Sequence, residues 1–280
     1  MREKINLYEE KSGYTRFCYG TSFGRALLKL LVRPWVSKTV GCFMDSRLSK
    51  PLIKRFVKKN GIDLNVYQGA PYKSYNSFFT RKIKDGQRAF DMSAGALCAP
   101  CDSALSVYPI EADSLFSIKG GSYSCASLLG DEQLAKQFEG GTCLIFRLAV
   151  TDYHRYSFFD SGRILSTKYI PGVLHTVRPI ALERYDFFKE NSRAVSVMET
   201  ENFGTAAFVE VGALLVGRIK NHDVTAFSRG EEKGYFEFGG STCVLLLKKD
   251  AARIDEELIA NTSAGFESKV QLGERIGERY

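Results

Sequence analysis

A histidine at the end of a predicted strand is the first group in this chain that could carry chemistry. His154 follows the apolar run 142–150 and lies in the segment Asp152-Tyr153-His154-Arg155. A neutral imidazole can take up or give a proton near pH 7, so this histidine suits general acid–base catalysis. A hydrogen-bonded structural histidine fits the same residues. His175 and His222 have contexts typical of a strand and of a turn.

The peptide Gly239-Gly240-Ser241-Thr242 offers a second kind of chemistry. Two glycines before Ser-Thr, between two predicted strands, fit a β-bulge or a tight turn. The same peptide is suited to backbone cleavage, because glycine leaves the Gly240 carbonyl open to attack by the Ser241 hydroxyl. The local sequence favours the turn and leaves cleavage as the alternative.

The cysteines indicate reduced thiols and no metal centre. Cys98 and Cys101 have the spacing of a zinc ribbon, but no second Cys or His pair follows them to complete four ligands. The start Met1-Arg2-Glu3-Lys4 does not resemble a signal peptide, and no apolar run is long enough to span a bilayer. We therefore expect a chain that folds on the cytoplasmic side.

The positive charge of the chain is concentrated near its N-terminus. The net charge is +7 over 280 residues, whereas residues 1–60 hold fourteen Lys or Arg and four Asp or Glu, a net charge of +10. A basic block of this kind predicts a polyanionic partner. Because no nucleotide-binding or RNA-binding motif accompanies it, we expect no nucleic acid and favour an anionic membrane surface.

Two amphipathic helices are predicted in the basic block. Thr21-Ser22 can begin a helix that continues until Pro34, and residues 49–59 form a second helix that ends at Asn60-Gly61. Each pattern places Lys and Arg opposite Phe and Leu, as in helices that lie in a membrane interface. Packing of the apolar side on a neighbouring domain is the alternative. We assign residues 1–75 to a basic helical, membrane-associating segment.

Residues 76–280 have the residue pattern of a β-rich domain, which we assign as the catalytic domain. Short β-branched and aromatic runs alternate with Gly, Asp and Ser, which predicts a barrel-like or sandwich-like arrangement and an α+β, mainly β fold class. The residues after 260 are polar enough to fray. The predicted strands are 104–110, 142–150, 164–170, 206–219 and 234–247, and the predicted helices are 124–129, 132–138 and 255–260.

Six segments in order give the chain a resemblance to the phosphatidylserine decarboxylases. These enzymes form phosphatidylethanolamine with a pyruvoyl group made from their own backbone. The matching segments are Asn76-Ser77-Phe78-Phe79-Thr80-Arg81-Lys82, Ala99-Pro100-Cys101-Asp102-Ser103, Asp152-Tyr153-His154-Arg155, Tyr169-Ile170-Pro171-Gly172, Val209-Glu210-Val211-Gly212-Ala213 with Val216-Gly217, and Lys233-Gly234-Tyr235-Phe236 with Gly239-Gly240-Ser241-Thr242.

The resemblance implies self-cleavage between Gly240 and Ser241. It implies a triad of Asp102, His154 and Ser241, in which the histidine is the base and the aspartate fixes its tautomer. The products would be a β chain, residues 1–240, and an α chain, residues 241–280, that begins with the pyruvoyl group derived from Ser241. The α/β heterodimer could assemble into a higher oligomer. Many relatives carry a second histidine where this chain has Ser157.

The resemblance also implies the reaction and its place in the cell. Phosphatidylserine would condense with the pyruvoyl carbonyl to a Schiff base, lose CO2, take a proton from His154, and leave as phosphatidylethanolamine. We expect a carboxy-lyase of phospholipid biosynthesis, peripherally bound to the cytoplasmic face of the cell membrane. The alternatives are a decarboxylase of another amine and a β-rich lipid-binding protein that is never processed.

Overall fold

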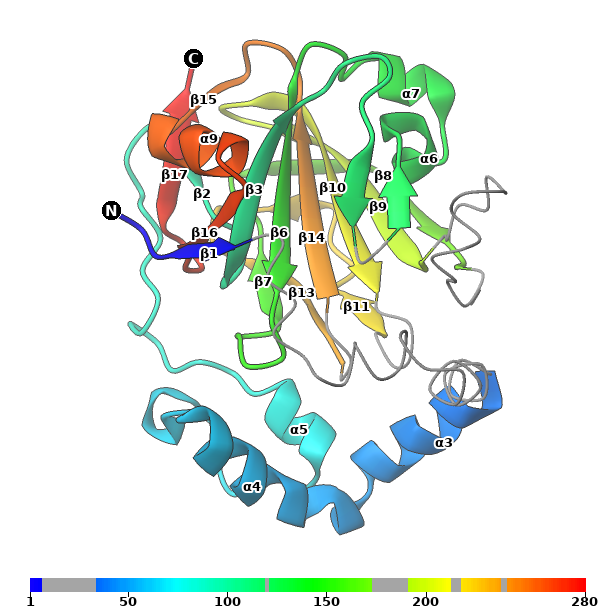
Figure 1. Cartoon of the computed structure of the whole chain (residues 1–280), viewed down its shortest axis with the longest axis vertical. Coiled ribbons are helices and arrows are strands. Elements are labelled where there is room, and N and C mark those ends of the chain that lie inside the picture. Colours follow the sequence, from blue (N-terminus) through cyan, green and yellow to red (C-terminus); the bar gives the residue numbers. More distant parts are fainter. Residues whose placement is uncertain (7–33, 119–120, 173–190, 213–217, 238–240) are drawn as a thin grey trace.

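A nine-stranded antiparallel sheet forms the centre of the protein (Figure 1). The computed structural model describes residues 1–6, 34–118, 121–172, 191–212, 218–237 and 241–280. The strands, in order across the sheet, are β1 (Lys4–Asn6), β16 (Phe266–Val270), β3 (Ser103–Pro109), β6 (Thr142–Leu148), β14 (Ser241–Leu247), β10 (Gly204–Gly212), β9 (Arg193–Thr200), β8 (Gly162–Ile170) and β12 (Ala226–Phe227).

Two small sheets cover one face of this sheet. Their strands are β11 (Ile219–Asn221), β13 (Glu232–Phe236) and β7 (Arg155–Ser157), and β15 (Ala252–Ile254), β17 (Arg275–Arg279) and β2 (Ala96–Cys98). Cys243 and Leu245 of β14 point into the core between the layers, where they join Tyr156 and Phe236. Side chains alternate along a strand, so every second residue of β14 faces this large core.

Two helices and a hairpin cover the opposite face. They are α6 (Cys125–Leu129), α7 (Glu132–Lys136) and the pair β4 (Phe116–Ile118) and β5 (Gly121–Tyr123). Val244 and Leu246 of β14 join this second core with Leu128. Because β14 is buried on both faces, its sequence reads as a continuous apolar run. A further helix, α9 (Glu256–Ser263), lies between β15 and β16 in the chain.

The basic N-terminal segment forms a helical group at one end of the molecule (Figure 1). Its elements are α3 (Pro34–Asp45), the 3-10 turn η1 (Arg47–Ser49), α4 (Lys50–Asn60), the 3-10 turn η2 (Leu64–Val66) and α5 (Tyr75–Phe79). Helix α4 ends at Gly61, which takes the left-handed conformation at φ 61° that glycine tolerates. Ile53 and Phe56 of α4 pack on Tyr75 and Phe78 of α5.

The structure confirms the mainly β fold class and most of the predicted elements. The finer prediction of a barrel-like or sandwich-like arrangement is not confirmed: the described strands form no closed barrel but an open sheet with β1 and β12 at its edges. The prediction that the C-terminus frays is also wrong: β16 pairs with β3 and β17 pairs with β2. Helix α3 begins at Pro34, where we had placed an interruption. The predicted helix before it lies outside the described residues.

The first residues of the chain pair with its last strands. β1 pairs with β16, and Arg2 forms ion pairs with Asp255, Glu257 and Glu274. The start of the segment that we assigned to the membrane is therefore part of the sheet. The helical elements of residues 34–79 precede β2 in the chain, and Phe79 at the end of α5 contacts His154 in the loop between β6 and β7.

Candidate active site

Ser241 is the first residue of β14, in the middle of the large sheet. It pairs with Leu148 of β6 on one side and Gly212 of β10 on the other. By the alternation that places Cys243 in the large core, the Ser241 side chain lies on the same face. Its Oγ is buried and has no hydrogen-bond partner among the described residues. Gly240, the other half of the expected cleavage site, lies outside them.

A buried hydroxyl without a hydrogen bond is unfavourable in a folded protein. Leaving such a group unsatisfied costs about 1–3 kcal/mol, so it needs an explanation. A nucleophile that is consumed by its own reaction provides one, because its environment is arranged for attack and not for a stable hydrogen bond. Cleavage at the Gly-Ser peptide, which the sequence kept as an alternative, stays a prediction.

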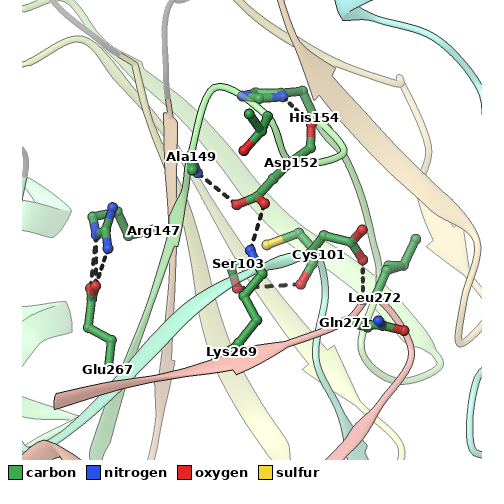
Figure 2. Close-up of polar contacts among 12 residues, drawn as sticks. Cys101, Ser103, Arg147, Ala149, Asp152, His154, Glu267, Lys269, Gln271 and Leu272 are labelled. Atoms are coloured by element: carbon green, nitrogen blue, oxygen red, sulfur yellow. Dashed lines mark hydrogen bonds and ion pairs between the residues drawn. The ribbon is translucent and has the colours of Figure 1, made fainter. Parts of the chain in front are cut away.

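His154 lies in the loop between β6 and β7, and it is fully buried. The Asp152 carboxylate closes the turn before it, where it accepts hydrogen bonds from the Ala149 amide at 2.8 Å and from Lys269 Nζ at 2.6 Å (Figure 2). The Phe79 ring covers the imidazole with a distance of 3.9 Å between ring centroids. Capping by Ser74 starts α5 and thereby places Phe79 at the end of that helix.

The backbone fixes the tautomer of His154. Its Nδ1 lies 2.8 Å from the carbonyl oxygen of Asp152 (Figure 2). A carbonyl oxygen only accepts, so Nδ1 carries the proton of the neutral ring and Nε2 carries the lone pair. This is the arrangement that a general base needs. The carbonyl of His154 also accepts from the Phe236 amide at 2.9 Å, which ties the loop to the strand leading into the Gly239-Gly240 peptide.

Asp102 lies just before β3, and its carboxylate pairs with Arg88 and not with His154 as we expected. Its carboxylate accepts from Arg88 Nε at 3.0 Å and Nη2 at 2.8 Å, and from the Leu272 amide at 2.8 Å. The hydrogen bonds to the Asp102 carboxylate raise the pKa of Arg88. The contact that we expected Asp102 to make with His154 Nδ1 is therefore made by the Asp152 carbonyl. Any part that Asp102 plays in cleavage stays a prediction.

Ser157 and His222 have other partners in the described part of the chain. The backbone amide of Ser157 in β7 donates to the Pro100 carbonyl at 2.9 Å. His222 is exposed and its Nε2 lies 2.8 Å from Glu232 Oε1, as expected for a turn residue. His175 lies outside the described residues. No group of three or more His, Cys, Asp or Glu in the described part of the chain could hold a metal ion.

A buried ion pair that sequence reasoning missed lies beside the start of β14. Lys233 Nζ donates to Glu210 Oε1 at 2.5 Å, and both side chains are almost fully buried. Asn221 donates to the other Glu210 oxygen at 3.1 Å and accepts from the Tyr156 hydroxyl at 2.8 Å. Glu210 pairs in register with Cys243. The sequence showed both charged residues but gave no sign that they meet.

The chain is similar to a single family over most of its length. The family model described as phosphatidylserine decarboxylase matches residues 75–278. Phosphatidylserine decarboxylase proenzyme 2 of Clostridium acetobutylicum is 45% identical over 281 residues, which covers 99% of this chain and 97% of that protein. The phosphatidylserine decarboxylase proenzyme of Ruminiclostridium cellulolyticum is 44% identical and covers 92% and 89%.

A third relative agrees with these two. The phosphatidylserine decarboxylase proenzyme of Clostridium perfringens is 41% identical over 273 residues, or 95% of this chain and 93% of that protein. The match extends across the basic helices as well as the sheets. By the family model and by these relatives, the chain belongs to the phosphatidylserine decarboxylase family.

Proposed function

We propose that this protein cleaves itself between Gly240 and Ser241 and then decarboxylates phosphatidylserine to phosphatidylethanolamine and CO2. The observation that carries the proposal is the buried Ser241 hydroxyl at the head of β14, which has no hydrogen-bond partner among the described residues. The names of the relatives support it, since each is called a phosphatidylserine decarboxylase proenzyme.

Cleavage uses two groups of the chain itself. The Ser241 oxygen attacks the Gly240 carbonyl carbon while His154 Nε2 takes its proton and passes it to the departing Ser241 nitrogen, so an ester replaces the amide. Removal of the Ser241 α-proton then expels the carboxylate of Gly240. The dehydroalanine that remains takes up water and releases ammonia, which leaves a pyruvoyl group on residues 241–280. The proton on Nδ1 places the lone pair of the neutral ring on Nε2, the atom that takes the Ser241 proton.

The residues present fit such a group. Residue 241 is buried at the start of a central strand, in register with Gly212 of β10. A pyruvoyl carbonyl supplies an electron sink for the electrons that remain when CO2 departs. We assign to His154 the delivery of a proton to the carbon that has lost CO2, because its imidazole can act as a general acid.

We assign the membrane contact to the exposed side of the helical group. Leu48, Leu52 and Phe43 are exposed, with Leu48 at 77% of its full area. Arg47 and Lys50 are exposed beside them. Apolar side chains among Lys and Arg favour an anionic membrane surface. No helix in the described residues is long and apolar enough to cross a membrane. We place the protein peripherally on the cytoplasmic face of the cell membrane.

Intact-mass analysis of purified protein tests the proposal. The native chain should give two masses, for residues 1–240 and for residues 241–280 with the N-terminal pyruvoyl group, and should release CO2 from phosphatidylserine vesicles. Ser241→Ala should stay one inactive chain. Ser106→Ala, at another buried strand serine, is the control and should still be cleaved. A single uncleaved mass for the native protein would show an unprocessed lipid-binding protein instead.

A further inference from the structure

Arg81 is a buried cation whose charge nothing in the described structure neutralises. Its side chain lies at the end of α5 and the residue is 2% exposed. Its hydrogen bonds to the Phe78 carbonyl, the Thr151 carbonyl and the Tyr67 hydroxyl are each 3.4 Å long. Its Nε has no hydrogen-bond partner, and none of the ion pairs among the described residues includes it.

The rings around Arg81 do not replace a counter-ion. The guanidinium carbon lies 4.3 Å from the centre of the Tyr67 ring and 4.8 Å from that of Phe78. Such contacts favour a cation but do not supply an acceptor for its N–H donors, of which Nε has none among the described residues and the others have only the three 3.4 Å bonds. A buried charge is normally paired, because removing it from water is costly. The unpaired charge and the unpartnered Nε therefore point to an anion that comes from outside the chain.

Arg81 lines a pocket that is basic and holds no acid. The pocket has a volume of about 390 Å³, and its other charged lining residues are Lys73, Lys82 and Arg155. Arg155 is already paired with Glu232 at 2.7 Å. Lys73 and Lys82 are exposed at the surface. Arg81, Lys73 and Lys82 therefore line the pocket with three positive charges that could bind an anion.

Two residues that line this pocket, Thr80 and Arg155, are chain neighbours of Phe79 and His154. Arg155 directly follows His154, and its Nε donates to the Thr80 carbonyl at 2.9 Å. Phe79, two residues before Arg81, covers the imidazole. The pocket also includes Tyr72 and Ser77 of the helical group that we assign to the membrane. An anion bound here would lie between the membrane-facing helices and the histidine.

We propose that this pocket binds the phosphodiester of the phospholipid headgroup. The inference rests on the proposed function. Phosphatidylserine carries a phosphate and a carboxylate, and the carboxylate leaves as CO2. Cations held against the carboxylate would stabilise the substrate more than the transition state and would slow the reaction. The phosphate keeps its charge from substrate to product, so it can be held without that penalty. A guanidinium also matches phosphate geometry.

The kinetic test uses the self-cleaved protein and a short-chain phosphatidylserine below its micelle concentration, so that membrane binding does not contribute. Arg81→Gln should raise KM about 10- to 100-fold, the range for hydrogen bonds to charged groups, with kcat changed little. Arg81→Lys should recover part of the loss. Lys82→Gln should raise KM, whereas Lys84→Gln, an exposed lysine on the same segment outside the pocket, should not.

A binding test separates this inference from the proposed function. Calorimetry on the uncleaved Ser241→Ala chain uses glycerophosphoserine, inorganic phosphate and serine as probes. Glycerophosphoserine should bind, more tightly than inorganic phosphate, and binding should be lost in Arg81→Gln. Serine should not bind. Tighter binding of inorganic phosphate would indicate a free-phosphate site and overturn the assignment.

The two proposals fail in different ways. If the native protein releases no CO2 from phosphatidylserine, the proposed function fails, and the calorimetry still reports whether the pocket takes a phosphodiester. If the native protein is active but KM and glycerophosphoserine binding are unchanged in Arg81→Gln and Lys82→Gln, the pocket inference fails alone. Should Arg81→Gln not fold, the comparison of Lys82→Gln with Lys84→Gln decides the matter.

Discussion

The imidazole of His154 is oriented by the main chain of Asp152, whose carbonyl oxygen lies 2.8 Å from Nδ1. A main-chain oxygen stays in place in every side-chain variant, so the tautomer of His154 does not depend on a carboxylate. The Asp152 side chain does not contact the imidazole in this way; its carboxylate accepts hydrogen bonds from the Ala149 amide and from Lys269 and so holds the turn. The orientation of His154 therefore does not require Asp102, whose carboxylate is bound to Arg88.

The first prediction therefore compares His154→Ala with Asp102→Asn. General acid–base catalysis contributes about 10²–10⁴-fold, so His154→Ala should slow self-cleavage by that factor. Asp102→Asn should be cleaved faster than His154→Ala, and its main loss should be stability, about 1.5–3 kcal/mol for weakened bonds to Arg88. A mass time course measures cleavage, and denaturant unfolding measures stability. If folded Asp102→Asn is cleaved as slowly as His154→Ala, Asp102 acts on the histidine after all.

The second prediction concerns the two chains after cleavage. Residues 241–280 supply β14, which lies between β6 and β10, and β16, which lies between β1 and β3. Lys269 of this part also holds Asp152 in the turn before His154. The chains should therefore co-elute in size-exclusion chromatography and separate only in denaturant. Elution of the short chain alone in native buffer would contradict the strand order.

The third prediction concerns the membrane. Lys54, Lys58 and Lys59 are exposed on α4. Each lysine near an anionic surface contributes about 1 kcal/mol, so replacing all three by glutamine should weaken binding to phosphatidylserine-containing vesicles roughly 100-fold at low salt. Vesicle co-sedimentation measures this.

The matched control for the membrane prediction also removes three positive charges, but from lysines outside the helical group. Lys136, Lys220 and Lys249 are exposed and lie outside the helical group. Their replacement by glutamine should leave vesicle binding close to that of the native protein. Equal weakening by both triple variants would show that net charge, and not α4, sets the affinity. Deleting residues 1–60 would be a poorer test, because it removes β1 and Arg2 from the sheet.

Local patterns in the sequence were enough to find most of the elements. The apolar run of β14 and the Ser124 start of α6 are readable because burial and capping act on neighbouring residues. The C-terminal strands were missed for the opposite reason. β17 contains Arg275, Glu278 and Arg279, and it is held by pairing with β2 far earlier in the chain. No local pattern reports such a partner.

The candidate site shows the same division. The resemblance implied that Ser241 and His154 are the reactive groups, whereas the local sequence alone favoured a turn at 239–242 and left a structural histidine open at 154. The partners of those groups are set by tertiary contacts: Lys269 reaches Asp152 and Phe79 reaches His154 across long stretches of chain. The resemblance implied a contact between Asp102 and His154, whereas in the structure the Asp102 carboxylate forms an ion pair with Arg88.

The fourth prediction concerns thiol reactivity and its dependence on pH. Cys42 is exposed, whereas Cys125 is buried and burial raises its pKa to about 11. A raised pKa keeps the thiol protonated at pH 8, and only the thiolate reacts. With Cys18 replaced by serine, iodoacetamide should label Cys42 first, and Cys125 should react only as the pH approaches 11 or the chain unfolds. Labelling of Cys125 at the rate of Cys42 at pH 8 would contradict the burial of α6.

The last prediction concerns the buried pair Glu210 and Lys233. Removing one partner leaves the other charge buried without compensation, which costs about 3–5 kcal/mol. Glu210→Gln and Lys233→Met should each lower the free energy of unfolding by about that amount. The measurement is denaturant unfolding in the Ser241→Ala background, because that chain stays in one piece and can refold.

Replacing both partners tests whether the loss comes from the unpaired charge. Two buried charges exchanged for apolar side chains of similar volume are often neutral in stability. The double variant Glu210→Met with Lys233→Met should therefore regain most of the loss. A small deficit should remain because Asn221 loses its acceptor on Glu210. If the double variant is instead destabilised by the sum of the two single losses, the pair is not coupled, and the 2.5 Å contact does not describe the protein in solution.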